Sequence, residues 1–287
     1  MSITKSIIHL STLRGLKTAI MTAAVLSIFV SPAALAAGGN GSEIVGTVPY
    51  LLTATGDTNS QNGGCPLGNA VADATRTYLD CDIAIICGGD LVDNLPSGEI
   101  TWDELRSVFA EDRPLATATI TVKQLREILE AGLSHIVLDD KERIDAQASM
   151  YEGGYPQISG LTLNYDASAA PGERVRFIAI GDENMKLDDD TTQIKLAATI
   201  FMLEGGYGMP AKADTMVPSG KTLVDVMARY ISDGMADYRN TGERIHPMGV
   251  SNVPLSGVLI AGVIIVITAL SWSRSRRMMK RYSNFKR

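Results

Sequence analysis

The most constraining feature of the sequence is a helical pattern that leads directly into a short apolar run and two glycines. Apolar residues recur at helical spacing from Leu67 to Tyr78, which predicts a helix opening at Gly68-Asn69. Residues 83–86 are Ile, Ala, Ile and Ile, and Gly88-Gly89 end the run. An uninterrupted apolar run bounded by glycines is typical of a central strand that is covered on both faces.

The remaining patterns predict both helices and strands. Capping boxes at Thr101–Glu104 and Thr121–Gln124 predict two helix starts. Alternation of side chains predicts strands at residues 116–121, 161–165, 174–180 and 194–199. Apolar residues at helical spacing predict a last helix at 223–231. Strands 161–165 and 174–180 flank a Pro-Gly turn and are expected to pair as a hairpin. Because helices and strands do not alternate strictly, the pattern predicts an α+β domain with a mixed sheet.

Several segments, in this order, resemble the C-terminal domain of the 5′-nucleotidase family. They are Leu67–Ala74, Asp82–Gly89, Gly98–Trp102, Tyr155–Leu161, Asn164–Asp166 with Pro171–Val175, and Glu204–Gly208. The resemblance implies an α+β fold with mixed sheets sandwiched between helical layers. It also implies a role in substrate recognition, because in that family a separate N-terminal metallophosphatase domain carries out hydrolysis with two metals.

The family's substrate loops correspond to two glycine-rich segments of this chain. The candidate substrate-binding residues are Gly88, Gly89, Asp90, Phe109, Gly205, Gly206, Tyr207 and Met209. The glycines match the family pattern, which predicts that the loop shape is kept.

The side chains that bind the nucleoside in the family largely differ here. The family's Asn falls on Cys87, its Arg on Val92, and its third glycine on Asp90. The two Phe rings that stack on the purine fall near Glu111 and on Met209. Stacking on a flat ring contributes about 1–3 kcal/mol per base, so these differences weaken the predicted nucleoside site. Tyr207 and Phe109 are the candidate replacements, and core packing is the alternative role of Phe109.

Catalytic and metal-binding residues are not predicted in this chain. After residue 36 the histidines are His135 and His246, which are far apart in sequence. A two-metal site draws on several imidazoles and bridging carboxylates. We therefore expect no cofactor in this chain, and divalent metals only through a separately encoded metallophosphatase subunit. No G-x-x-x-x-G-K-[ST] phosphate loop and no G-x-S-x-G motif occur.

Two hypotheses for the function follow. In the first, the chain is a membrane-tethered accessory domain of nucleotide hydrolysis that binds a nucleoside or nucleotide and completes the substrate cleft of a metallophosphatase partner. In the second, it is a non-catalytic binding or structural module at the cell surface that uses a degenerate nucleotide cleft.

Both ends of the chain are typical of targeting segments. Residues 1–36 predict a signal peptide, because a basic start precedes an apolar run and Ala34-Leu35-Ala36 is a cleavage motif. An uncleaved anchor helix is the alternative. Residues 37–239 form the predicted domain and 240–254 a stem. Residues 255–272 predict a transmembrane helix, and the basic residues 273–287 a cytoplasmic tail. Residues 254–257 (Pro-Leu-Ser-Gly), the apolar run and the basic tail together also have the layout of a processed sorting signal.

Charge and cysteine content agree with an exported domain. Three of the 26 basic residues precede residue 37 and seven follow residue 272, which leaves sixteen against 32 acids and a net charge of −16 between these ends. Such a surface repels phosphate backbones, so nucleic acid is not an expected partner. Cys65, Cys81 and Cys87 allow one disulfide of undetermined pairing, and a buried free thiol is favoured for Cys87 because it ends an apolar strand.

Overall fold

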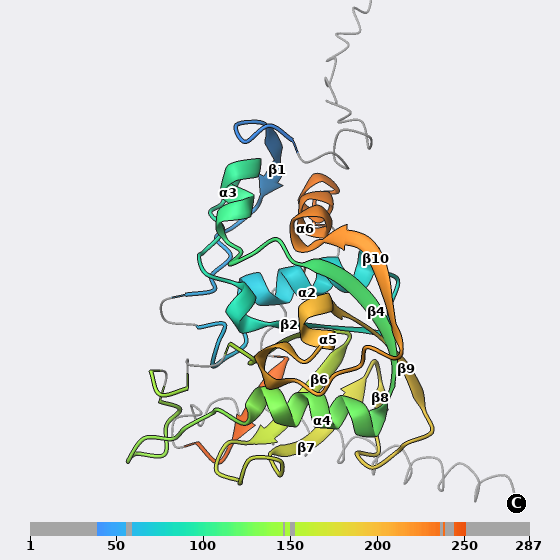
Figure 1. The fold of residues 1–287 in the computed structure, drawn as a ribbon. Helices are drawn as coiled ribbons and strands as arrows, with labels where there is room; N and C mark the ends of the chain where they lie inside the picture. Colours follow the sequence, from blue (N-terminus) through green and yellow to red (C-terminus); the bar gives the residue numbers. More distant parts are fainter. Residues whose placement is uncertain are drawn as a thin grey trace, which may run out of the picture.

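The fold is a mixed α+β domain built on a central five-stranded sheet (Figure 1). The computed structural model describes residues 39–55, 59–145, 147–149, 153–235, 238 and 244–250. The central sheet has the strand order β10-β4-β9-β2-β5. Its strands are β2 (Ile83–Cys87), β4 (Pro114–Thr121), β5 (Pro156–Ser159), β9 (Gln193–Thr199) and β10 (Met216–Thr222).

Strand β2 lies inside this sheet, and all five of its residues are buried. It runs parallel to β9, with Ile83 opposite Leu196, and antiparallel to β5. The prediction of a strand covered on both faces is therefore confirmed. Successive side chains point to opposite faces, so Ala84 and Ile86 join one apolar core while Ile83 and Ile85 join the other.

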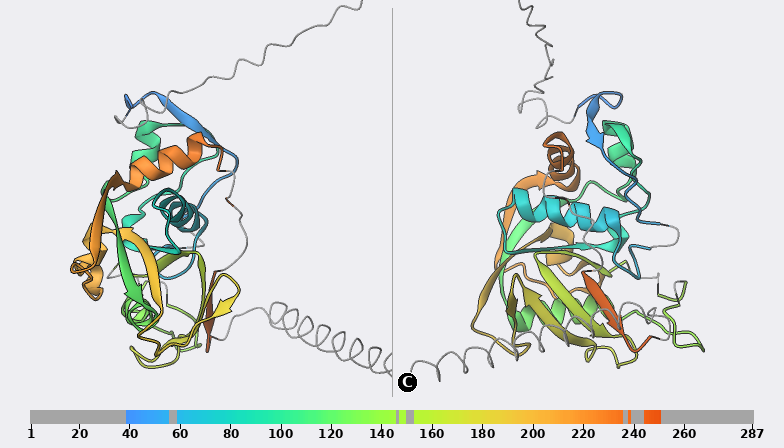
Figure 2. Two further views of the ribbon diagram at one scale, coloured as in Figure 1. Left: turned by 90° about the vertical axis from the view of Figure 1, so that its right-hand side faces the viewer. Right: turned by 180° about the vertical axis from the view of Figure 1, so that it is seen from behind.

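One face of the central sheet is covered by helices (Figures 1 and 2). These are α2 (Pro66–Tyr78), α3 (Trp102–Ser107) and α6 (Leu223–Ser232). A two-stranded antiparallel sheet of β1 (Ile44–Val48) and β3 (Gly98–Thr101) contributes to the same core. Helix α2 was predicted from its apolar spacing, and nine of its residues are buried.

The other face departs from the expected helical layer. It packs against α4 (Val122–Leu133), the short α5 (Ile200–Leu203) and a second, four-stranded sheet. That sheet contains β6 (Leu161–Asp166), β7 (Val175–Ile180), β8 (Glu183–Asn184) and β11 (Ile245–Met248). The predicted hairpin is confirmed as β6 and β7. The prediction of mixed sheets is confirmed, but one side of the central sheet is shared between helices and a sheet.

Threonine residues at strand ends begin helices α3, α4 and α6. The predicted capping boxes at Thr101 and Thr121 are both formed, and Thr222 with Asp225 forms a third. In each, the hydroxyl accepts a backbone N–H of the first turn while the acidic or amide side chain accepts the N–H of the threonine. Each of these helices therefore follows its strand without a loop.

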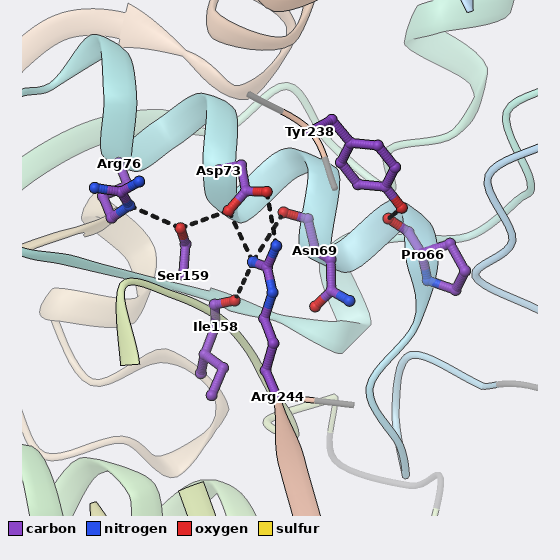
Figure 3. A network of polar contacts seen from close by, with 8 residues as sticks. All are labelled: Pro66, Asn69, Asp73, Arg76, Ile158, Ser159, Tyr238 and Arg244. Atoms are coloured by element: carbon purple, nitrogen blue, oxygen red, sulfur yellow. Dashed lines mark hydrogen bonds and ion pairs between the residues drawn. The ribbon is translucent and has the colours of Figure 1, made fainter. Parts of the chain in front are cut away.

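A network of polar side chains attaches β11 to the domain (Figure 3). Arg244 donates from both terminal nitrogens to the two carboxylate oxygens of Asp73, each at 2.7 Å. It also donates to the carbonyl of Ile158 at 2.8 Å. Ser159 donates to Asp73 at 2.6 Å, and Arg76 donates to Ser159 at 2.9 Å. Part of the segment predicted as a stem thus belongs to the domain, because β11 pairs in parallel with β6.

Among the residues that the structure describes, none of the helices has the length and apolarity required to cross a membrane. The predicted signal peptide at 1–36 and the predicted transmembrane helix and tail at 255–287 lie outside the described residues.

We expect Arg244→Met to destabilise the domain by about 2–4 kcal/mol, because it leaves the Asp73 carboxylate, only 10% exposed, without its cation. The amide of Leu163, which donates to the carbonyl of Arg244, should also exchange its hydrogen faster. Urea unfolding and hydrogen exchange measure the two effects. The control Arg229→Met removes an exposed pair with Asp233 and should change stability by less than about 1 kcal/mol. Equal losses in the two variants would contradict this role of Arg244.

Candidate functional site

The candidate site lies where β2 and β9 end. Since the two strands are parallel, their carboxyl ends lie at the same edge of the central sheet. The turn after β2 is η1 (Gly88–Asp90), and α5 followed by η2 (Gly206–Gly208) comes after β9. The two glycine-rich segments singled out in the sequence are therefore brought into contact.

Glycines in this contact have no room for a side chain. A Cβ atom on Gly89 would lie 2.7 Å from the Cα atom of Gly153 and 2.9 Å from the hydroxyl of Tyr207. A Cβ atom on Gly153 would lie 2.5 Å from the Tyr207 ring, and one on Gly206 would lie 2.3 Å from Phe201. Real Cβ atoms do not approach this closely, so these positions require glycine. Two aromatic rings occupy the space beside the glycines.

Asp90 is the polar centre of the site. Its side chain is fully buried, and its Oδ1 accepts hydrogen bonds from Arg113 Nε at 2.7 Å and from the Tyr207 hydroxyl at 3.1 Å. Its Oδ2 is also buried and has no hydrogen-bond partner among the described residues. A buried oxygen of this kind destabilises the ionised form of the carboxyl group.

Aromatic rings enclose the guanidinium of Arg113. Its central carbon lies 3.8 Å from the centre of the Phe201 ring and 5.8 Å from the centre of the Tyr207 ring. The two rings are 5.0 Å apart and nearly perpendicular, at 84°. A cation held over an aromatic face is stabilised by the ring quadrupole, more strongly where water is excluded. Only 13% of the Arg113 side chain is exposed.

Burial controls the protonation of this cluster. It raises the pKa of Asp90 from 3.8 to about 6, against the opposing effects of the Arg113 charge and the Tyr207 hydrogen bond. Burial and the neighbouring Asp90 carboxylate also raise the pKa of Tyr207. The Tyr207 hydroxyl therefore remains a donor to Asp90.

Tyr207 has a left-handed backbone conformation, with φ of 54°. Residues with a Cβ atom rarely adopt this conformation, which costs about 1–2 kcal/mol. Here the hydrogen bond to Asp90 and the contact with Phe201 hold the side chain in place. Backbone strain of this kind is concentrated at functional sites.

The remaining predicted site residues have other roles. Phe109 is buried in the core on the α2 side, and its backbone pairs with Leu91. Met209 is buried in the opposite core. Gly88 packs against the backbone of Ser60, and Gly205 has a φ of 102°. Gly89, Asp90, Gly206 and Tyr207 meet in the cluster, whereas Phe109 and Met209 are core residues.

Arg113 and Phe201 were not predicted as site residues. Arg113 lies in the turn before β4, where the sequence carries no recognisable motif. One signal was available: Asp90 follows a buried strand directly, and a buried carboxylate requires a cation or several donors. That requirement does not identify which basic residue supplies the charge.

The three cysteines are buried and free, as favoured for Cys87. Cys65 has a local role at the start of α2, where its sulfur accepts the backbone N–H of Gly68 at 3.2 Å. Burial raises the pKa of the Cys65 thiol to about 11, so it is protonated near neutral pH. Across the described ranges, no group of three or more His, Cys, Asp or Glu side chains is arranged to hold a metal ion.

Comparison with known proteins identifies the family. Residues 44–214, more than half of the chain, match the family described as 5′-nucleotidase, C-terminal domain. The chain belongs to this family. The resemblance inferred from the sequence blocks is thereby confirmed.

Two Bacillus subtilis proteins are related in sequence to this member of the 5′-nucleotidase C-terminal family. The trifunctional nucleotide phosphoesterase protein YfkN is 30% identical over 150 residues, which cover 50% of this chain and 9% of YfkN. The endonuclease YhcR is 36% identical over 161 residues, which cover 56% of this chain and 11% of YhcR. The chain thus matches about a tenth of the length of these relatives.

A solved structure shows the same fold. The 5′-nucleotidase precursor from Thermus thermophilus superposes with a TM-score of 0.60 at 20% identity, over 74% of this chain and 40% of that protein. The two proteins therefore share a fold although only a fifth of their aligned residues are identical.

The raised pKa of Asp90 predicts a specific pH dependence of stability. Because the native state binds this proton more tightly than the unfolded chain, the contribution of Asp90 is greatest below about pH 4 and is lost as the pH rises through about 6. A shift of about two pKa units corresponds to about 3 kcal/mol. Relative to Asp90→Asn, the wild type should lose about this much stability over that range, as measured by urea unfolding.

Comparing the wild type with Asp90→Asn cancels the effect of carboxyl groups that titrate in both proteins. One of these is Asp139, whose pKa is lowered to about 2 by Arg143. The control is Asp93→Asn, an exposed carboxyl in the same loop, which should leave the wild-type curve unchanged. Parallel curves for wild type and Asp90→Asn would contradict the assignment.

Proposed function

We propose that this chain is an accessory, substrate-recognition domain of nucleotide hydrolysis. The observation that carries the proposal is the cluster of Asp90, Arg113, Phe201 and Tyr207 at the edge where β2 and β9 end. It combines aromatic rings, which can stack on a base, with a carboxylate, which can accept hydrogen bonds from the edge of a base. The family membership and the name of YfkN, a nucleotide phosphoesterase, support nucleotides as the ligand class.

In this proposal the metals and the hydrolytic step belong to a separately encoded metallophosphatase. The chain has three histidines in all, one of them in the predicted signal peptide. Two-metal hydrolases need a dense set of imidazole and carboxylate ligands. The domain is exported by the signal peptide at 1–36 and anchored in the cytoplasmic membrane by residues 255–272, with its acidic body on the extracytoplasmic side.

Two observations favour the alternative, a non-catalytic binding or structural module. Arg113 already occupies the face of Phe201, and Phe109 and Met209 are buried in the cores. In that case the cluster stabilises the domain and nucleotides do not bind it.

The test is a thermal-shift screen of the full chain in detergent against nucleosides, nucleotides and sugar phosphates. A ligand that binds only the folded state raises the melting temperature, and a concentration of 100 times Kd contributes about 2.7 kcal/mol. We expect a shift with a nucleotide that is lost in Tyr207→Ala and kept in Tyr50→Ala, which changes an exposed tyrosine outside the cluster. If no nucleotide gives a shift, the alternative is favoured.

The accessory role also predicts that the pure chain does not release phosphate from AMP in the presence of Mn²⁺ or Zn²⁺. Release should require the metallophosphatase partner, and a metallophosphatase gene adjacent to this one would identify the candidate. Metal-dependent hydrolysis by the pure chain would contradict the proposal.

A further inference from the structure

The guanidinium of Arg113 is held in the manner of a bound planar ligand. One of its faces lies 3.8 Å from the centre of the Phe201 ring. Its Nε–H donates to the buried carboxylate of Asp90 at 2.7 Å. A flat group with N–H donors on one edge and an aromatic ring against its face is the geometry by which proteins recognise an extruded base.

The Asp90 carboxylate accepts hydrogen bonds at only one of its two oxygens among the described residues. Asp90 Oδ2 has no partner among the described residues, and the whole side chain is buried. A carboxylate commonly accepts two parallel N–H bonds from a bidentate donor. Arg113 supplies a single Nε–H bond to Asp90. A ligand with two adjacent N–H donors would therefore satisfy the site better than Arg113 does.

Arg113 also has a partner outside the cluster. Its Nη1 lies 3.2 Å from a carboxylate oxygen of Glu111, whose side chain is 67% exposed. A rotation of the Arg113 side chain toward solvent can keep this ion pair. That movement would expose the Phe201 face and the Asp90 carboxylate together.

We propose that the position of the Arg113 guanidinium is a binding site for a guanine base, which Arg113 fills when no ligand is present. This inference rests on the proposed function and specifies its ligand. The Watson–Crick edge of guanine carries N1–H and N2–H₂ side by side, which is the donor pattern of a guanidinium. Hypoxanthine lacks the amino group, and adenine presents an acceptor nitrogen beside its amino group. Two hydrogen bonds to Asp90 therefore select guanine.

The test compares guanosine, inosine and adenosine by calorimetric titration of the full chain in detergent at pH 8, where the ionised carboxylate is favoured. Arg113→Ala removes the side chain that fills the site. We expect it to bind guanosine at least tenfold more tightly than the wild type does, and at least tenfold more tightly than it binds inosine or adenosine. Adding Asp90→Asn to Arg113→Ala should abolish the preference for guanosine.

Arg106→Ala is the matched control. Arg106 also lies over an aromatic ring, 5.3 Å from the centre of the Trp102 ring, and pairs with an acid, Asp103, but its side chain is 40% exposed. It should bind guanosine with the wild-type affinity. The melting temperature and circular dichroism of each variant establish that it is folded before titration.

The outcomes separate this inference from the proposed function. Equal affinity of Arg113→Ala for guanosine and adenosine overturns guanine selection and leaves nucleotide recognition intact. Binding of a nucleotide by the wild type that is unchanged in Arg113→Ala places the ligand elsewhere and also overturns the inference. If folded Arg113→Ala binds no nucleoside, the guanine site is rejected, whatever the screen of the wild type shows.

Discussion

The parallel pairing of β2 with β9 is the constraint on which the rest of the site depends. It requires both strands to leave the central sheet at the same edge, so that the turn at Gly88–Asp90 meets the turn at Gly206–Gly208. Antiparallel pairing would have placed these turns at opposite ends of the sheet. The buried strand β2 holds this arrangement, because a one-residue slip in its register would exchange the side chains of two apolar cores.

The cluster at this edge is an energetic compromise. Asp90 is placed where ionisation is unfavourable, and one cation and one hydroxyl stabilise only one of its two oxygens. Tyr207 adds backbone strain to the same place. Replacing a buried ion pair with apolar side chains of similar volume often leaves stability unchanged or increases it, so packing alone does not require this cluster. Retaining a buried charge and a strained residue side by side is consistent with a site that exchanges one partner for another.

The folded domain extends past the segment that matches the family. The family match ends at residue 214, yet α6 and β11 continue the fold. Strand β11 is short, and the ion pair between Arg244 and Asp73 attaches it to α2. The chain that leads toward the predicted membrane segment is therefore connected directly to the core of the domain.

Local signals in the sequence were enough to predict several elements of the fold. Apolar spacing, capping boxes and turn residues predict helices α2, α3 and α4, strand β2 and the β6–β7 hairpin. The residues that make up each of these signals lie within a few positions of one another in the sequence. The sequence also indicated the family and the two glycine-rich turns. It did not reveal the edge pairing of β11 or the second sheet on one face, because neither depends on a local pattern.

Which side chains meet depends on contacts between segments that are distant in the sequence. Asp90, Arg113 and Phe201 are far apart in sequence, and nothing in the residues around Arg113 marks it as the partner of a buried carboxylate. Likewise, the packing of the whole domain places Phe109 in one apolar core and Met209 in the other. Local propensity determines where strands begin and end, whereas burial and charge pairing between distant segments determine what a site contains.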